Sequence, residues 1–267
     1  MSKIISIVSL KGGVGKTTTA INLGSSLSQD FNKKVLILDS NFSSPGVGLH
    51  FGVVNPENTV QDVLSNKTKI NNAVYKINTG LYIMPANFLS KKVDMFTLKN
   101  KLNDLRQYYD YILLDTAPAI NSSTITAISA SDEALVVSNP DYLGLSATLR
   151  TVQLINQKQI PLRGIILNNV KNKSFELTKQ DLEQASNAKI ISTIPSSQQF
   201  SEAMINTTSL VLHNPKSTIS KLYKDLAAKI SETTVVKDPF KNKLKKLFKK
   251  SITQEEVEKL LIENEIK

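Results

Sequence analysis

Short, largely apolar runs recur along the chain, and the residues within each run do not alternate regularly between polar and apolar. Such runs are typical of strands buried on both faces, as in a parallel sheet covered by helices. Two of the runs end in an aspartate and one ends in an asparagine. The predicted strands are residues 4–8, 34–39, 81–84, 111–115, 134–138, 164–168 and 189–192.

The segments between these runs place their apolar residues at helical spacing. Strands that alternate with helices predict an α/β fold with a doubly wound, mainly parallel sheet and helices on both faces. We expect one such domain over residues 1–232, followed by a linker, residues 233–239, that ends in a proline. The clearest predicted helices are residues 16–28, 98–108, 146–157 and 217–230.

A glycine-rich turn joins the first predicted strand to the first predicted helix. A strand that ends in such a turn and restarts as a helix directs successive backbone N–H groups at one anion-sized hollow. Lys16 would then place a charge on the β- and γ-phosphates of a nucleotide, and the Thr17 hydroxyl can bind Mg²⁺. The residues expected to hold the nucleotide in this phosphate loop are Gly12, Gly13, Val14, Gly15, Lys16, Thr17 and Thr18.

The loop departs from the usual pattern at its first position, where Leu10 replaces glycine and a second lysine, Lys11, follows. In this the chain resembles the MinD/ParA family of deviant Walker ATPases, whose signature is K-G-G-x-G-K-[ST]. The segments 139–141 and 214–217 match the MinD branch, so the resemblance covers essentially all of residues 1–232. It implies a P-loop NTPase fold, with ATP and Mg²⁺ as cofactors.

The resemblance also gives Lys11 a role between subunits. In the family this lysine reaches the phosphates of the nucleotide on the other subunit, so that two ATP molecules lie in a symmetric dimer. A cation at that position stabilises charge on the γ-phosphate. The resemblance therefore implies a homodimer in the ATP-bound state, whereas from the residue alone Lys11 is a solvated loop lysine.

The aspartates that end two predicted strands are candidate metal ligands, because ligands of doubly wound sheets lie outside the carboxyl ends of the strands. Asp115 has the position and type of a Walker B carboxylate, which holds Mg²⁺ through water. Asp39 and Thr17 complete the expected metal set. The alternative is that a carboxylate ending a strand is a helix cap or a turn former.

Residues 39–52 occupy the place of the family's switch I. Relatives usually carry Asp-x-Asp there, and the second Asp is thought to orient and help deprotonate the attacking water, but this chain has Asn41. An amide oxygen can accept a hydrogen bond from water but cannot take its proton. We expect slow ATP hydrolysis to ADP and phosphate; the alternative is that Asn41 is neutral and Asp39 or another group acts. The predicted catalytic residues are Lys11, Lys16, Asp39 and Asn41.

The strand that ends at Asn168 is not followed by the Asn-Lys-x-Asp motif of a GTPase. The resemblance implies that adenine is recognised by Asn168 and by the loop at residues 194–196, which includes Pro195. Asn169 stands where the MinD branch usually has an arginine.

The basic segment that begins at residue 240 forms an amphipathic pattern. On a helix, Phe240, Leu244, Leu247 and Phe248 fall within an arc of about 100°. Six lysines and Asn242 occupy the rest of residues 240–250. A narrow apolar face among long cationic side chains is typical of a helix that lies in a membrane interface, and the segment is similar to the membrane-targeting helix of MinD proteins. Packing of this helix on the domain and binding to DNA in the ParA manner are the alternatives.

The basic helix, residues 240–251, is followed by an acidic one, residues 252–267. Thr253 and Glu256 form a capping box for the acidic helix. It either docks a partner, folds back on the lysines and weakens membrane binding, or is a frayed terminus.

Composition narrows the class of protein. The chain has no cysteine, which excludes disulfides and iron–sulfur ligation by thiolates, and its net charge of +10 at pH 7 invites an anionic partner. No apolar run approaches the roughly 20 residues of a membrane-spanning helix, and no signal peptide is predicted. We expect a cytoplasmic protein that is peripheral on the inner face of the cell membrane.

The sequence thus predicts a MinD-like ATPase that dimerises on binding ATP, associates reversibly with an anionic membrane surface and positions or regulates a cellular assembly. A division site, a motility structure and a chemosensory structure remain open as the cargo, and the activating protein is unknown. The alternatives are a ParA-type ATPase that uses nucleoid DNA as its surface and a hydrolysis-impaired, ATP-gated scaffold.

Overall fold

The computed structural model describes residues 2–88 and 97–232. The chain divides into two units, residues 1–232 and residues 233–267, and the elements described here belong to the first. The predicted membrane residues Phe240, Leu244, Leu247 and Phe248, and the acidic segment after them, lie outside the described residues.

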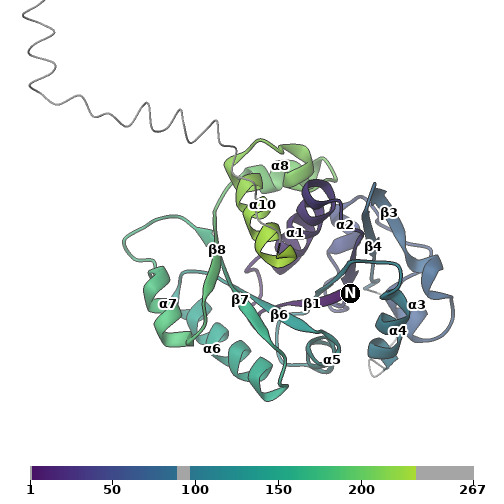
Figure 1. Cartoon of the computed structure of the whole chain (residues 1–267), viewed down its shortest axis with the longest axis horizontal. Coiled ribbons are helices and arrows are strands. Elements are labelled where there is room, and N and C mark those ends of the chain that lie inside the picture. The colour runs from purple at the N-terminus through teal and green to yellow at the C-terminus, as the bar shows by residue number, and fades with distance from the viewer. Residues whose placement is uncertain (1, 89–96, 233–267) are drawn as a thin grey trace, which may run out of the picture. The chain divides into compact units, whose positions relative to one another are not determined.

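The described residues form one sheet of eight strands (Figure 1). The strands are β1 (Lys3–Val8), β2 (Val35–Asp39), β3 (Tyr75–Asn78), β4 (Leu81–Met84), β5 (Tyr111–Asp115), β6 (Glu133–Ser138), β7 (Leu162–Val170) and β8 (Ile190–Pro195). Their order is β3-β4-β2-β5-β1-β6-β7-β8. β3 runs antiparallel to β4 and the other neighbouring strands run parallel, so the predicted mainly parallel sheet is confirmed.

Helices cover both faces of this sheet, as predicted (Figure 1). The helices are α1 (Lys16–Phe31), α2 (Val47–His50), α3 (Val60–Leu64), the 3₁₀ helix η1 (Ile70–Ala73), α4 (Leu98–Leu105), α5 (Ser122–Ala130), α6 (Tyr142–Gln157), α7 (Lys179–Ser186), α8 (Gln199–Ile205), α9 (Leu210–His213) and α10 (Thr218–Ser231). One apolar core joins α1 and α10 to the sheet, and two others on the opposite face join it to α3–α5 and to α5–α7.

The strands predicted from apolar runs are all present, whereas β3 was missed. β3 lies at an edge of the sheet and its residues are half-buried or exposed, so it has no continuous apolar run. The helix predicted over residues 146–157 begins earlier, at Tyr142, because the Asp141 side chain caps it by accepting a hydrogen bond from the Gly144 N–H. The helix predicted over residues 98–108 ends earlier, at Leu105.

The strand order determines which polar residues meet. β5 lies between β1 and β2, so the phosphate loop that follows β1 is close to the ends of both strands that finish in aspartate. In the register of β2 and β5, Asp39 is directly opposite Asp115. The fold therefore gathers the loop and the two carboxylates at one edge of the sheet.

Candidate nucleotide and metal site

The phosphate loop has the backbone conformation that its glycines allow. Gly13 and Gly15 have positive φ angles, 71° and 95°, and α1 begins at the residue after Gly15. A Cβ on Gly15 would collide with Nδ2 of Asn168, which donates a hydrogen bond to the Val14 carbonyl oxygen at 2.7 Å. Glycine is therefore required at position 15 both by its conformation and by the contact with β7.

Lys16 lies inside the loop, with a residue exposure of 6%. Its ammonium donates to the Lys11 carbonyl oxygen at 3.3 Å, and among the described residues it forms no ion pair. Burial lowers the pKa of Lys16, and the nearby Asp115 carboxylate partly opposes this. A buried cation held by a neutral acceptor is favourably placed to bind an anion such as a phosphate.

Thr17 and Asp115 face each other at the start of α1. The Thr17 hydroxyl donates to Oδ2 of Asp115 at 2.6 Å, while Oδ1 of Asp115 is buried without a hydrogen-bond partner among the described residues. Burial, together with the charge of Asp39, raises the pKa of Asp115 to about 8. The hydroxyl and the unsatisfied carboxylate oxygen are the donor set that Mg²⁺ prefers, so these residues fit the predicted metal.

Asp39 has a second task that the sequence did not reveal. Its Oδ1 accepts from the Asn41 N–H, and its Oδ2 accepts from the N–H groups of Gly46 and Val47 at 2.8 and 3.0 Å. Burial raises the pKa of Asp39 to about 6, although these hydrogen bonds oppose the rise. Asp39 therefore holds the loop between β2 and α2 in place as well as facing Asp115.

Asn41 uses its side chain within this same loop. Nδ2 donates to the Ser44 carbonyl oxygen at 2.7 Å, and Oδ1 accepts from the Ser43 hydroxyl and the Ser44 N–H. The amide thus closes a turn over residues 41–44, a common use of asparagine. In this arrangement its polar atoms are engaged with the protein rather than turned toward a water molecule.

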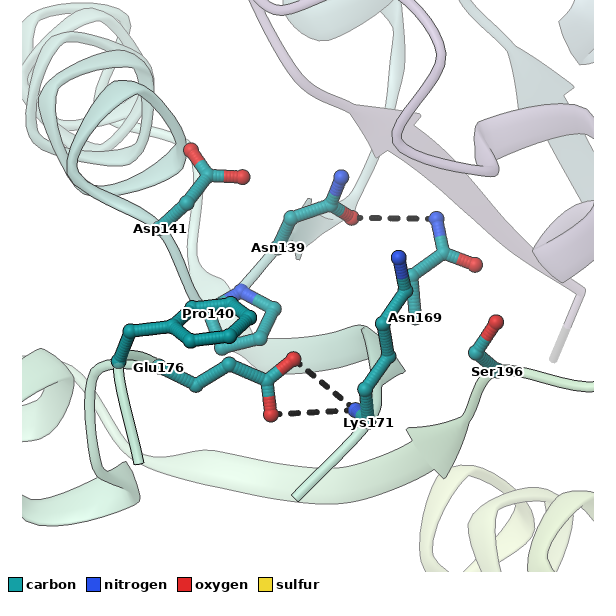
Figure 2. Close-up of a pocket in the computed structure, with 8 residues that line it drawn as sticks. Asn139, Pro140, Asp141, Asn169, Lys171, Glu176 and Ser196 are labelled. Atoms are coloured by element: carbon teal, nitrogen blue, oxygen red, sulfur yellow. Dashed lines mark hydrogen bonds between the residues drawn. The ribbon is translucent and has the colours of Figure 1, made fainter. Parts of the chain in front are cut away.

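The predicted adenine residues lie at the carboxyl ends of β7 and β8. Oδ1 of Asn168 is buried without a hydrogen-bond partner among the described residues, and Pro195 is the last residue of β8. Beside them is a cavity of about 440 Å³. Figure 2 shows Asn139 and Asn169 approaching each other on its wall and Glu176 accepting from the Lys171 backbone N–H. Asn169 and Ser196, which directly follow the two predicted residues, line this cavity, whereas Asn168 itself is buried behind it.

The ammonium of Lys11 does not lie inside the phosphate loop with that of Lys16. Its ammonium forms an ion pair with Asp141, at 2.8 and 2.9 Å from the two carboxylate oxygens. The pair lies at the rim of the site, with side-chain exposures of 25% for Lys11 and 47% for Asp141. Hydrogen bonds from Lys11 and from the Gly144 N–H hold the pKa of Asp141 below its usual value, although partial burial opposes them.

The sequence analysis did not single out Ala119, which lies four residues after Asp115. It has φ +85°, a left-handed conformation that alanine rarely adopts. It lines a cavity of about 490 Å³ with Leu10, Lys11 and Ile120. An alanine with a positive φ angle cannot be recognised from the sequence, because the surrounding fold imposes that backbone conformation.

Comparison with known proteins relates the chain to nucleotide-binding families. Residues 2–164 match the AAA domain model, and residues 91–266 match the model for 4Fe-4S iron sulfur cluster binding proteins of the NifH/frxC family. The present sequence has no cysteine to bind such a cluster through thiolates.

The alignments with individual relatives span most of this chain and most of each relative. The sporulation initiation inhibitor protein Soj of Bacillus subtilis is 30% identical over 86% of this chain and 99% of its own length. The chromosome partitioning protein ParA of Caulobacter vibrioides is 27% identical over 85% and 93%. Among solved structures, the septum site-determining protein MinD of Pyrococcus horikoshii, in complex with Mg-ADP, has a TM-score of 0.80 and 27% identity over 86% of this chain and 96% of that one.

Replacing Asp115 by Asn tests the charge balance of the carboxylate pair. The folded-state pKa, about 8, exceeds the ordinary value of 3.8, so Asp115 lowers stability progressively as pH rises between these values. We expect Asp115→Asn to raise the melting temperature of the nucleotide-free protein above about pH 8, to raise it less near pH 5, and to abolish the extra stabilisation that Mg²⁺ gives with ADP. Differential scanning fluorimetry measures all three effects.

The exposed carboxylate Asp104 on α4 offers a matched control, since Asp104→Asn changes the net charge equally but leaves the site intact. Retention of the full Mg²⁺ effect in Asp115→Asn would show that the metal is held elsewhere.

Replacing Ala119 by Gly relieves a left-handed alanine. We expect Ala119→Gly to increase the free energy of unfolding by about 1 kcal/mol, measured by urea denaturation. The control Ala117→Gly is expected to destabilise the protein, because Ala117 is buried and has no positive φ. A loss of stability in Ala119→Gly would mean that the methyl group contributes more through packing than the backbone loses through strain.

Proposed function

Because the chain belongs to the MinD/ParA family of P-loop ATPases and uses ATP with Mg²⁺, we propose that it dimerises on binding ATP and then associates reversibly with an anionic membrane surface. Through this cycle it positions or regulates a cellular assembly. The ATPase class follows from the family, whereas the dimer, the membrane and the assembly are the proposal.

The position of Lys11 is the main observation that supports the proposed dimer. Lys16 already supplies a cation inside the loop, while the Lys11 side chain extends to the rim and ends on Asp141. Exposed ion pairs contribute about 0–1 kcal/mol, so exchange of Asp141 for the phosphates of a second subunit is inexpensive. Asp141 keeps the Gly144 N–H as its partner after the exchange and continues to cap α6.

Exposed apolar side chains occur in the segments beside Lys11 and its partner Asp141. Ile120 is 58% exposed, Tyr142 is 76% exposed and Leu143 is 74% exposed. Ile120 and Leu143 line the cavity of about 490 Å³ together with Lys11. Burial of apolar surface gives roughly 25 cal/mol per Å², so a second copy placed over this face would gain contact energy where Lys11 crosses. These exposed residues support dimerisation through the phosphate-loop face.

The bound nucleotide is held chiefly by the loop and by Lys16. Mg²⁺, held by Thr17 and Asp115, would neutralise charge on the β- and γ-phosphates. The N–H groups of the loop and the Lys16 ammonium stabilise the charge that develops on the transferred phosphoryl group, and Lys11 of a second copy adds to it. The base would lie in the cavity of about 440 Å³ that Asn169 and Ser196 line, next to Asn168 and Pro195 in the chain.

Slow turnover follows from two properties of Asn41. The amide cannot accept the proton of the attacking water. It is also occupied by the turn over residues 41–44, and it must leave Ser44 before it can orient that water. The ATP-bound dimer would accordingly persist. If turnover were negligible, the protein would act as the hydrolysis-impaired, ATP-gated scaffold named above as an alternative.

Membrane association rests on the sequence of residues 240–250. No helix within residues 2–88 and 97–232 is long and apolar enough to cross a membrane. Each lysine near an anionic leaflet contributes about 1 kcal/mol, so one copy of the basic segment binds weakly. Two copies on one dimer bind more tightly through their high effective concentration. The similarity to ParA keeps DNA as a second candidate surface.

Sedimentation with anionic liposomes tests this function. We expect the full chain to pellet with ATP but not with ADP, because ATP brings two basic segments together. A chain ending at Val236 is expected to remain in the supernatant and yet to form the ATP-dependent dimer in light scattering. Lys11→Ala is expected to lose both dimerisation and pelleting, with Lys99→Ala as an exposed control. Pelleting with DNA rather than liposomes would instead assign the ParA-type surface.

Asn41→Asp tests the cause of slow turnover. We expect this variant to release phosphate several-fold faster than the unmodified chain, because a carboxylate can orient the water and accept its proton. Asn41→Asp loses only the hydrogen bond that Nδ2 donates to the Ser44 carbonyl oxygen. Asn41→Ala loses this bond and the two that Oδ1 accepts, without gaining a base, and is the control for loop disruption. Equal rates for the unmodified chain and Asn41→Asp, with both folded, would show that another group activates the water.

A further inference from the structure

Another cavity, of about 280 Å³, lies at the opposite edge of the sheet from the phosphate loop. Its position follows from the topology, because Lys34 immediately precedes β2 and Tyr82 lies at the start of β4. Tyr109 comes shortly before β5, which pairs in parallel with β2. The polar residues of this tyrosine–lysine cavity are Lys34, Asn71, Lys76, Tyr82, Tyr108 and Tyr109.

The two lysines of the tyrosine–lysine cavity have no carboxylate partner within residues 2–88 and 97–232. Lys34 and Lys76 are both exposed, and neither forms an ion pair with another described residue. Lys76 is opposite Tyr82 in the register of β3 and β4, which puts both side chains on one face of the sheet. The neighbouring Asp110 accepts from the Lys34 backbone N–H at 2.8 Å but does not line the cavity. The lining therefore carries positive charge without a carboxylate.

The tyrosines add hydroxyl groups and ring surface. The hydroxyls of Tyr82, Tyr108 and Tyr109 form no hydrogen bond with the described residues, in contrast to Tyr75, whose hydroxyl donates to Asn58. Tyr82 and Tyr109 pack edge to face with 5.5 Å between ring centres, and Tyr108 is 47% exposed. Burial raises the pKa of Tyr109 to about 12, so its phenol remains a neutral donor at physiological pH.

The lining thus offers side-chain hydrogen-bond donors, two ammonium charges and aromatic surface within one small space. A phosphate group suits the ammonium and hydroxyl donors, and a planar ring suits the tyrosine faces. The cavity volume is near the lower end of the range for small-molecule sites. We propose that the tyrosine–lysine cavity binds a small phosphorylated ring compound of the nucleoside monophosphate class, at a site separate from the phosphate loop.

Titration calorimetry with guanosine monophosphate tests this proposal, using the full chain with its phosphate loop saturated by Mg²⁺ and a non-hydrolysable ATP analogue. We expect the double variant Lys34→Gln/Lys76→Gln to weaken binding by about tenfold or more, because it removes both charges. The exposed pair Lys99→Gln/Lys158→Gln removes the same charge elsewhere and is expected to leave the affinity unchanged. Tyr108→Phe should retain more affinity than Tyr108→Leu, which removes the ring.

Four results would overturn the proposal. Guanosine monophosphate could fail to bind at millimolar concentration, or bind the Lys34→Gln/Lys76→Gln variant as tightly as the unmodified chain. Inorganic phosphate could bind as tightly as the nucleotide, which would remove the role of the rings. A single-stranded oligonucleotide could bind where the monophosphate does not, which would assign the surface to nucleic acid. These results do not depend on the membrane cycle, because the phosphate loop is occupied throughout.

Discussion

Asp39 and Asp115 end adjacent parallel strands, and both carboxyl groups are fully buried. Two carboxylates brought together away from water raise each other's pKa, and the folded chain tolerates them only where donors or cations compensate. Asp39 accepts hydrogen bonds from backbone N–H groups of the loop that follows β2. Asp115 accepts one from the Thr17 hydroxyl at the start of α1. The two aspartates thus hold the loop before α2 in place and form a hydrogen bond to the first turn of α1, the helix that follows the phosphate loop.

The compensation by protein groups is incomplete, and this explains why the site suits a magnesium nucleotide. Oδ1 of Asp115 has no hydrogen-bond partner among the described residues, and the Lys16 ammonium is held by a neutral carbonyl. Mg²⁺ would satisfy the first group and a phosphate the second. The nucleotide-free fold therefore keeps one carboxyl oxygen without a partner and one weakly satisfied cation close together, and ligand binding stabilises both groups.

The surface that we assign to a second copy is continuous with this site. Lys11 begins the phosphate loop, and Ala119 and Ile120 follow Asp115 along the chain. All three line one cavity with residues of α6, whose cap, Asp141, holds Lys11 in the isolated chain. The phosphate loop and the segment after Asp115 therefore each contribute residues both to the nucleotide and metal site and to the surface that we assign to a second copy. The tyrosine–lysine cavity belongs to the opposite edge and shares no residue with these segments.

The sequence by itself determined the parallel strands, the phosphate loop and the aspartates that end β2 and β5. Buried strands need continuous apolar runs, and a phosphate loop needs glycines and a lysine at fixed spacing, so both leave local patterns. Only the tertiary structure decided that Lys11 rests on Asp141, that Asn41 closes its own loop and that Ala119 is strained. It also gathered Lys34, Lys76 and three tyrosines from separate segments. These contacts depend on which strands become neighbours, and β1, β2 and β5, which are neighbours at the phosphate loop, are far apart in the chain.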